Sequence, residues 1–187
     1  MKHPKPIDNE IKLSSKRYIV SKTDAKGIIE YGNDYFVEIS GYSQKELIGQ
    51  PHSIVRHPDM PKIAFKLMWD RISQGKNFMA VVKNLCKDGS YYWVVTDFEP
   101  RVDPLTNEII SHTAFRKAAP QKAIDTMIPI YDKLLELEKD GGMEASGEYL
   151  TNFLNENNTT YDAFINKLVG NSGLFKLFFT AMKKMFS

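Results

Sequence analysis

The sequence predicts an α+β fold, in which an antiparallel sheet with a belt of short helices precedes an all-helical extension. Strand-like runs occur as a pair near the start and as a group of three in the middle, with short helical segments between the two groups. After Pro120 the pattern is helical throughout. With 187 residues, the chain has room for one ordinary domain and a smaller appendage. We therefore expect a polar leader over residues 1–16, a core domain over 17–119 and a helical extension over 120–187.

The composition argues against several classes of protein. The chain has 25 Lys and Arg residues against 23 Asp and Glu residues, and a net charge of +2 is too small for general nucleic-acid binding. The single cysteine, Cys86, cannot form an internal disulfide or a cysteine-based metal cluster, and it suits a reducing compartment. The N-terminus lacks the apolar core of a signal peptide, and no run of about 18 apolar residues occurs. We therefore expect a cytoplasmic protein that does not span a membrane and does not bind nucleic acid.

Residues 17–33 predict a β-hairpin. Two short runs, RYIVSKTD and KGIIEYGN, flank a turn at residues 24–27 in which glycine supplies a positive φ. The pattern then changes to short helical pieces separated by glycines. The first piece begins at Asn33, a residue type favoured at helix N-caps, and the second contains a capping box formed by Ser43 and Glu46.

A longer helix is predicted over residues 61–74. Ile63 and Leu67 recur at helical spacing and mark its inner face. Phe65 and Trp69, four residues apart, form an adjoining aromatic stripe. The helix therefore offers one face to the core and an aromatic stripe beside that face.

Three strands are predicted within residues 78–89, 90–102 and 108–118, because these runs are separated by the turn-forming segments DG and DPLTN. Helical segments follow, and the last of them, residues 173–186, has a wide apolar face with three lysines and no acidic residue. That face predicts burial against other helices of the extension or in a homodimer. Contact with a membrane surface or with a helix of a partner is the alternative.

Five short motifs follow one another through the predicted domain. They are GYSQKELIGQPHSIVRHPDMP at 41–61, MW at 68–69, VKN at 82–84, KDG at 87–89 and YWV at 92–94. Over about residues 18–117 this set resembles the PAS domain of the Aer aerotaxis and energy-taxis receptor family. The resemblance implies a PAS fold that binds FAD non-covalently and reports the redox state of the flavin to the chemotaxis machinery. It stops before the helical extension, so we expect a stand-alone sensor that signals to a separate chemotaxis transducer and meets a membrane through that partner.

The RHPD segment carries side chains that suit the pyrophosphate of FAD. Arg56 offers a permanently charged fork that matches phosphate oxygens, His57 can add a donor, and Pro58 restricts the backbone that presents them. Asp59 cannot hold a phosphate, so we expect it to orient Arg56 or His57, or to cap the helix that starts near Pro61. From spacing alone the cluster also fits a simple helix start, and the resemblance favours the cofactor.

Four further residues are candidates for contact with the flavin. Asn84 lies in a predicted strand, where asparagine is disfavoured, and its amide can donate to and accept from the pyrimidine edge of the ring. An outward-facing polar position is the alternative for it. Trp69 and Trp93, the only tryptophans, can flank a planar ligand, although large aromatics also build cores. Asn33 faces the flavin pocket by the resemblance, and by its position it is an N-cap.

Other ligands and functions stay open at this point. Haem is the main alternative, because His52, His57 and His112 are available to bind iron. His57 and Asp59 resemble an acid and base pair, but no nucleophile accompanies them, and we predict no enzymatic activity. A metal site of His52, His57 and Asp59 lacks a regular helical spacing. Cys86 lies in a strand, away from the belt where light-sensing flavin domains carry their reactive cysteine, so no photoadduct is expected. A PAS interaction module without a ligand is the remaining alternative.

Overall fold

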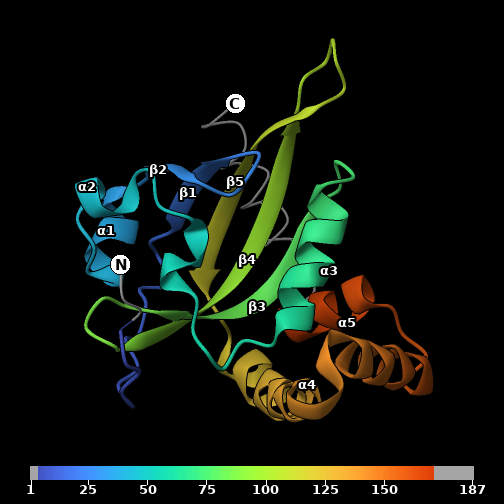
Figure 1. Cartoon of the computed structure of the whole chain (residues 1–187). Helices are drawn as coiled ribbons and strands as arrows, with labels where there is room; N and C mark the ends of the chain where they lie inside the picture. Colours follow the sequence, from blue (N-terminus) through green and yellow to red (C-terminus); the bar gives the residue numbers. More distant parts are fainter. Residues whose placement is uncertain (1–3, 171–187) are drawn as a thin grey trace.

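The computed structural model describes residues 4–170 and contains a five-stranded antiparallel sheet (Figure 1). Its strands are β1 (Ile19–Asp24), β2 (Ile29–Gly32), β3 (Phe78–Leu85), β4 (Tyr91–Val102) and β5 (Ile109–Ala118), in the spatial order β2-β1-β5-β4-β3. The predicted fold class is confirmed, and each predicted strand is present. The predicted amphipathic segment 173–186 lies outside the described residues.

Short helices connect β2 to β3 and form a belt beside the sheet (Figure 1). They are α1 (Asp34–Ser40), α2 (Gln44–Leu47), the 3₁₀ helix η1 (His52–Val55) and α3 (Lys62–Ile72). The predicted capping box of Ser43 and Glu46 is present at the start of α2. Of the two residues predicted to mark the inner face of α3, Ile63 is buried and Leu67 is only half-buried, while Met68 and Ile72 are also buried. Local sequence patterns therefore account for the belt.

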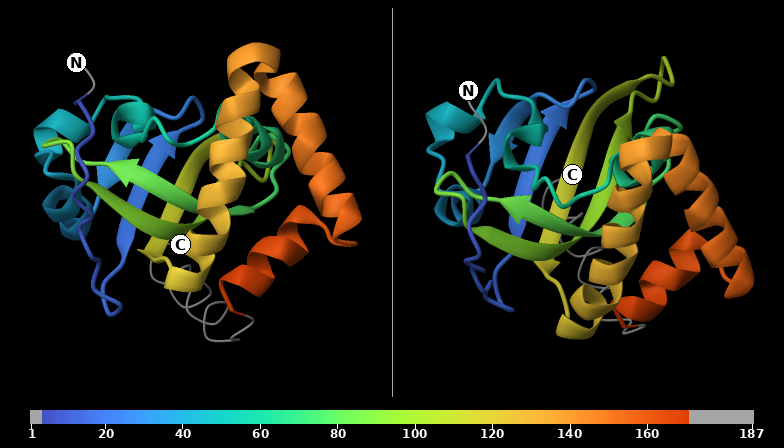
Figure 2. Two further views of the ribbon diagram at one scale, coloured as in Figure 1. Left: turned by 90° about the horizontal axis from the view of Figure 1, so that it is seen from below. Right: turned by 60° about the horizontal axis from the view of Figure 1, so that its bottom comes forward.

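The helical extension consists of α4 (Gln121–Glu156) and α5 (Tyr161–Leu168). Helix α4 bends at Gly142, where φ is 63° and ψ is −160°, a conformation that only glycine adopts readily. The second half of α4 turns back there and leads to α5 (Figure 2). Apolar side chains of both helices belong to the same hydrophobic core as the sheet. In addition, the Tyr131 hydroxyl of α4 donates to the Val81 carbonyl of β3 at 2.6 Å.

The start of the described chain pairs with the loop between β3 and β4. The Ile7 N–H donates to the Gly89 carbonyl at 2.9 Å, and the Ile11 N–H donates to the Tyr91 carbonyl at 2.7 Å. A Cβ atom on Gly89 would lie 2.3 Å from the Lys5 carbonyl oxygen, so glycine is needed for this approach. Within residues 4–170, no helix combines the length and apolar character needed to cross a bilayer.

Strand register decides which side chains face the helical belt. In the pairing of β3 with β4, Asn84 lies opposite Tyr92, and Lys83 lies opposite Trp93. Paired residues share a face of the sheet, and successive residues of a strand alternate between the faces. Asn84 and Tyr92 therefore lie on one face, whereas Lys83 and Trp93 lie on the other.

Candidate functional site

A cavity of about 270 Å³ lies between the sheet and the belt, bounded by α3, η1 and the turn between β1 and β2. Its lining is mainly apolar, and the residues that define its chemistry are Arg56, Phe65, Trp69, Asn84, His112 and Arg116. Trp69 is 39% exposed and packs against Gly27, so it marks the opening. Small-molecule pockets usually measure about 300–1,000 Å³, so this cavity matches a single planar ring system rather than a whole dinucleotide.

Asn84 projects from β3 into this cavity. It is 5% exposed, and its Nδ2 atom lies near the Tyr92 hydroxyl without forming a hydrogen bond of normal geometry to any described residue. A buried donor left without a partner costs about 1–3 kcal/mol. A ligand that placed an acceptor against this amide would offset that cost. The predicted candidate is thus at a position where a ligand contact would stabilise the fold.

Arg116 of β5 is a candidate residue that the sequence-based prediction missed. It is 2% exposed, and its guanidinium donates to the Ser21 hydroxyl at 2.9 Å and approaches the His52 ring nitrogen Nε2 at 2.9 Å. Burial lowers its pKa to about 10, so it stays protonated at neutral pH. No carboxylate of residues 4–170 forms an ion pair with it. A buried cation with neutral partners is costly, so the site favours a ligand with negative charge.

His52 of η1 is a neutral partner of Arg116. Burial and the positive charge of Arg116 lower the pKa of His52 to about 3. Because a guanidinium can only donate, Nε2 of His52 accepts this hydrogen bond. The Ser21 hydroxyl lies 3.0 Å from the same nitrogen, and the ring stacks on Phe36. His52 therefore fixes Arg116, and its Nε2 is already engaged.

His112 of β5 contributes an unpaired acceptor. Its Nε2 lies 3.3 Å from the Ala25 carbonyl, which can only accept, so Nε2 carries the proton of the neutral ring. Burial lowers the pKa of His112 and favours this neutral form. The remaining nitrogen, Nδ1, is buried without a partner among the described residues, and Trp69 packs edge-on against the ring. Among the three candidate histidines, His112 is thus the one with a free nitrogen at the cavity.

Of the RHPD residues, Arg56 lines the cavity. Its guanidinium lies 3.9 Å from the centre of the Phe65 ring and donates to the Met60 carbonyl at 3.3 Å. Its backbone forms an isolated antiparallel bridge with Asn84. The structure therefore brings together three of the predicted site residues, Arg56, Trp69 and Asn84.

His57 and Asp59 lie outside the cavity lining. His57 is 3% exposed, packs edge-on against Tyr91, and accepts from the Asp59 N–H through Nδ1 at 3.1 Å. The Asp59 carboxylate binds the Lys83 ammonium at 2.6 Å and lies 3.4 Å from His57 Nδ1. Burial and the charge of Lys83 lower the pKa of His57 to about 4. Since His52 is held elsewhere by Arg116, the three-residue metal site considered above is not assembled, and residues 4–170 contain no cluster of three metal-ligating side chains.

The start of α3 corrects one expectation about Asp59. The N-cap residue of α3 is Pro61, which has no side chain able to cap the helix. The Lys62 and Ile63 N–H groups donate to Oε2 and Oε1 of Glu138, each at 2.8 Å. The interpretation of Asp59 as the cap is therefore wrong, because the capping carboxylate comes from α4.

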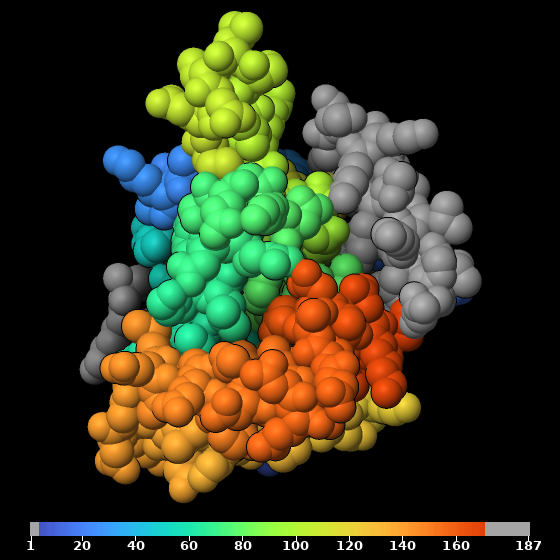
Figure 3. Space-filling view, turned by 90° about the vertical axis from the view of Figure 1, so that its right-hand side faces the viewer, coloured from blue at the N-terminus to red at the C-terminus, as the bar shows by residue number. Residues whose placement is uncertain are grey.

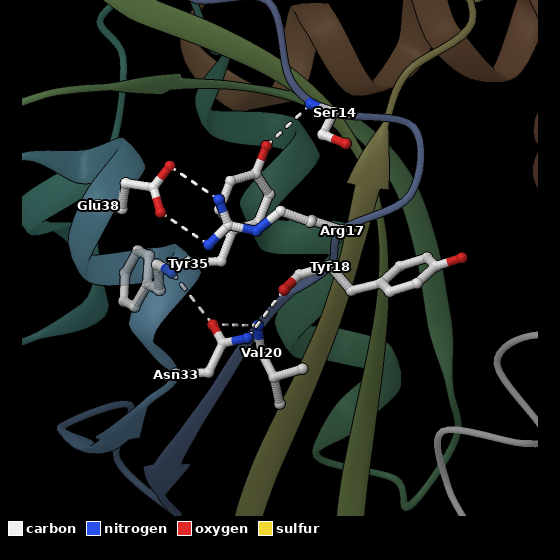
Figure 4. A network of polar contacts seen from close by, with 8 residues as sticks. Ser14, Arg17, Tyr18, Val20, Asn33, Tyr35 and Glu38 are labelled. Atoms are coloured by element: carbon white, nitrogen blue, oxygen red, sulfur yellow. Dashed lines mark hydrogen bonds and ion pairs between the residues drawn. The ribbon is translucent and has the colours of Figure 1, made fainter.

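Asn33 and Trp93 also lie away from the cavity lining. Asn33 is the predicted N-cap of α1, and its Oδ1 accepts from the Val20 and Phe36 N–H groups at 3.1 Å (Figure 4). Its Nδ2 donates to the Tyr18 carbonyl at 2.8 Å, so the side chain is fully engaged in joining α1 to β1. Trp93 is buried on the opposite face of the sheet from Asn84.

Comparisons with known proteins agree with this architecture. A family model described as the PAS fold matches residues 29–110. The aerotaxis receptor of Escherichia coli K12 is 38% identical over 132 residues, which cover 71% of this chain and 26% of the receptor. A nitrogen fixation regulatory protein of Klebsiella pneumoniae is 29% identical over 85 residues, which cover 46% of this chain and 17% of that protein. The chain thus spans 26% and 17% of the length of these two relatives.

A solved structure shows the same fold at low sequence identity. The dark structure of the blue-light photoreceptor Aureochrome1 LOV superposes with a TM-score of 0.54 at 18% identity, covering 59% of this chain and 82% of that one. This likeness concerns the fold alone. Together with the family match, it shows that residues 29–110 form a PAS domain, and over 132 residues the chain is a relative of the aerotaxis receptor.

Proposed function

We propose that this chain is a redox or energy sensor that binds FAD non-covalently, with the flavin ring in the cavity between the sheet and α3. One observation carries the proposal: within residues 4–170, a buried amide without a hydrogen-bond partner, Asn84, lines the same cavity as a buried cation without a paired carboxylate, Arg116. The pyrimidine edge of a flavin both donates and accepts hydrogen bonds, and nearby charge tunes the electronic state of the ring. The two side chains match these properties.

The pyrophosphate of FAD needs positive charge outside the ring pocket. The cavity volume suits the ring system, so the pyrophosphate and adenine would have to lie beyond it. Arg56 and the exposed Lys26 both line the cavity and supply that charge. We assign His57 and Asp59 to holding the loop that presents Arg56, and Asn33 and Trp93 to supporting α1 and the sheet.

Haem is a second candidate ligand, and one observation favours it. The Nδ1 atom of His112 is buried at the cavity and has no partner within residues 4–170, as an iron ligand would be before the metal binds. The neighbouring cation, Arg116, favours the flavin, because it matches a ring that becomes more negative on reduction. We therefore rank FAD first.

The proposed signal passes from the cavity to the helical extension. Bound flavin would supply reversible electron transfer. Reduction of the flavin would change the hydrogen bonds that the ring offers to Asn84. Asn84 belongs to β3, and its backbone forms a bridge with that of Arg56. Tyr131 of α4 bonds to Val81 on the same strand. We propose that a chemotaxis transducer reads the extension, and that the segment 173–186 supplies the contact with this partner or with a second copy of the chain.

Equilibrium titration of the purified chain with FAD and with haem tests the ligand assignment. We expect FAD to bind and to raise the melting temperature, and we expect haem to bind more weakly. Replacing Asn84 with Ala or Arg56 with Ala lowers FAD affinity, by about tenfold for each lost hydrogen-bonding or charged contact. Asn77→Ala is the matched control, because the Asn77 amide pairs with Glu99 at an exposed position. Full FAD retention in both cavity variants would remove the site assignment.

A further inference from the structure

We propose that Glu138 is a latch that couples occupancy of the cavity to the position of the helical extension, a role that rests on the proposed cofactor function. The latch consists of the Glu138 carboxylate and the first two N–H groups of α3, those of Lys62 and Ile63, at 2.8 Å each. These contacts join residues that are 76 and 75 positions apart in the sequence. They connect the helix that forms one wall of the cavity to the helix that leaves the sensor domain.

The N-terminus of α3 depends on this contact for its capping. The first N–H groups of a helix have no partner within the helix, and a carboxylate there is favoured by the helix dipole. Pro61, at the N-cap position, offers no side chain for the purpose. Glu138 therefore supplies from another element what a serine or aspartate would normally supply locally.

The latch also spans the bend in α4. Glu138 lies before Gly142, and the Ser146 hydroxyl, which lies after it, shares its one hydrogen between Glu138 Oε1 at 3.3 Å and the Met143 carbonyl at 3.2 Å. A displacement of the α3 start therefore acts on both halves of α4. Figure 3 shows α3 resting against α4 and α5 on this face of the molecule.

The opposite side of α3 faces the cavity. Four α3 residues, Phe65, Met68, Trp69 and Ile72, line it. A ring that filled the cavity would pack against these side chains and hold α3 in one place. Holding α3 fixes the two N–H groups opposite Glu138, so ligand binding strengthens the latch. By reciprocity, the latch must strengthen ligand binding by the same factor.

Another contact between α3 and the extension is less suited to this role. Arg71, near the end of α3, forms an ion pair with Asp162 of α5, and both side chains are about half exposed. Exposed ion pairs contribute little and tolerate movement, because solvent screens them. The directional, bidentate contact of Glu138 is the better reporter of the position of α3.

Hydrogen exchange of the full chain with and without saturating FAD tests the latch. In the wild type, FAD should slow exchange over residues 143–168 by about fivefold or more. In Glu138→Gln, FAD should still bind, about fivefold more weakly, and the slowing over residues 143–168 should fall below about twofold. Glu136→Gln is the matched control, since this carboxylate is exposed and pairs with Lys133 within α4. It should behave as the wild type does.

A double variant separates capping from coupling. Pro61→Ser combined with Glu138→Gln places a capping hydroxyl at the start of α3 without a link to α4, so α3 remains capped and the FAD response of residues 143–168 stays lost. The latch is overturned if Glu138→Gln or the double variant keeps the full response. It is also overturned if the wild type binds FAD without any slowing in that region. A wild type that binds no FAD overturns the proposed cofactor function, and the latch with it.

Discussion

Asn84 and Arg116 place two polar groups in the cavity that the described residues do not fully satisfy. The Asn84 amide lacks a hydrogen-bond acceptor, and the Arg116 cation lacks a negatively charged partner. Buried polar atoms in native proteins are nearly always paired, and exceptions tend to mark functional positions. Among the residues that the structure describes, an unpaired amide nitrogen and a cation with only neutral partners line the same cavity. This pairing of features favours a ligand that can accept a hydrogen bond and carry negative charge.

Replacing Arg116 with Gln should lower the reduction potential of the bound flavin. The substitution removes a positive charge that favours the more negative, reduced ring. A loss of about 1.4 kcal/mol of that preference corresponds to about 59 mV for one electron. Spectroelectrochemical titration measures the change, and Arg101→Gln, at an exposed position of β4, is the control. An unchanged or raised potential in Arg116→Gln would contradict a charge contact with the ring.

His52 makes the stability of the fold depend on pH. Its pKa is about 3 in the folded chain against 6.5 as the ordinary value, so between these values the unfolded chain binds more protons than the folded one. Stability therefore falls as the pH is lowered through this window. From pH 7 to pH 5 the contribution of His52 is at most about 2 kcal/mol.

Urea denaturation of the ligand-free chain at both pH values measures this effect. The variant His52→Asn keeps an acceptor for Arg116 and has no titrating ring, so its stability should change less between pH 7 and pH 5 than that of the wild type. An identical pH dependence in the two proteins would show that His52 is not held neutral.

At the scale of elements, the contact between α4 and β3 joins the extension to the sheet. Replacing Tyr131 with Phe removes the buried hydrogen bond to the Val81 carbonyl and keeps the ring. The free energy of unfolding should fall by about 1 kcal/mol, as measured by urea denaturation. Tyr149→Phe, on the second half of the same helix, serves as the control and should change stability much less. Equal losses in the two variants would argue against a specific role of the Tyr131 hydroxyl.

Local patterns predicted most elements, and long-range contacts explain what they missed. The capping box of Ser43 and Glu46 depends on neighbouring residues, so it is visible in the sequence. The cap of α3 comes from Glu138, far along the chain, and no local pattern indicates it. Capping was one of the two roles expected for Asp59, the nearest acidic residue, whose carboxylate instead contacts His57 and Lys83.

At the scale of the whole molecule, register separates the predicted site residues into two groups. Arg56, Trp69 and Asn84 converge on the cavity, although they come from a loop, a helix and a strand. Trp93 falls on the opposite face because it is paired with Lys83, and pairing cannot be read from one strand alone.

Arg116 was missed although a local signal existed. His112, Ala114 and Arg116 alternate along β5 and share its cavity face. An arginine at the inward position of a buried strand is the kind of exception that merits a functional hypothesis. The burial and the missing carboxylate become visible only when the sheet is assembled around it.

The absorption spectrum of the purified chain, before and after anaerobic reduction, shows whether the cavity holds a flavin. We expect a yellow protein with an oxidised flavin band that bleaches on reduction, and a loss of this band in a variant that combines Asn84→Ala with Arg56→Ala. A colourless protein in which excess FAD changes neither flavin fluorescence nor the melting temperature would contradict this expectation.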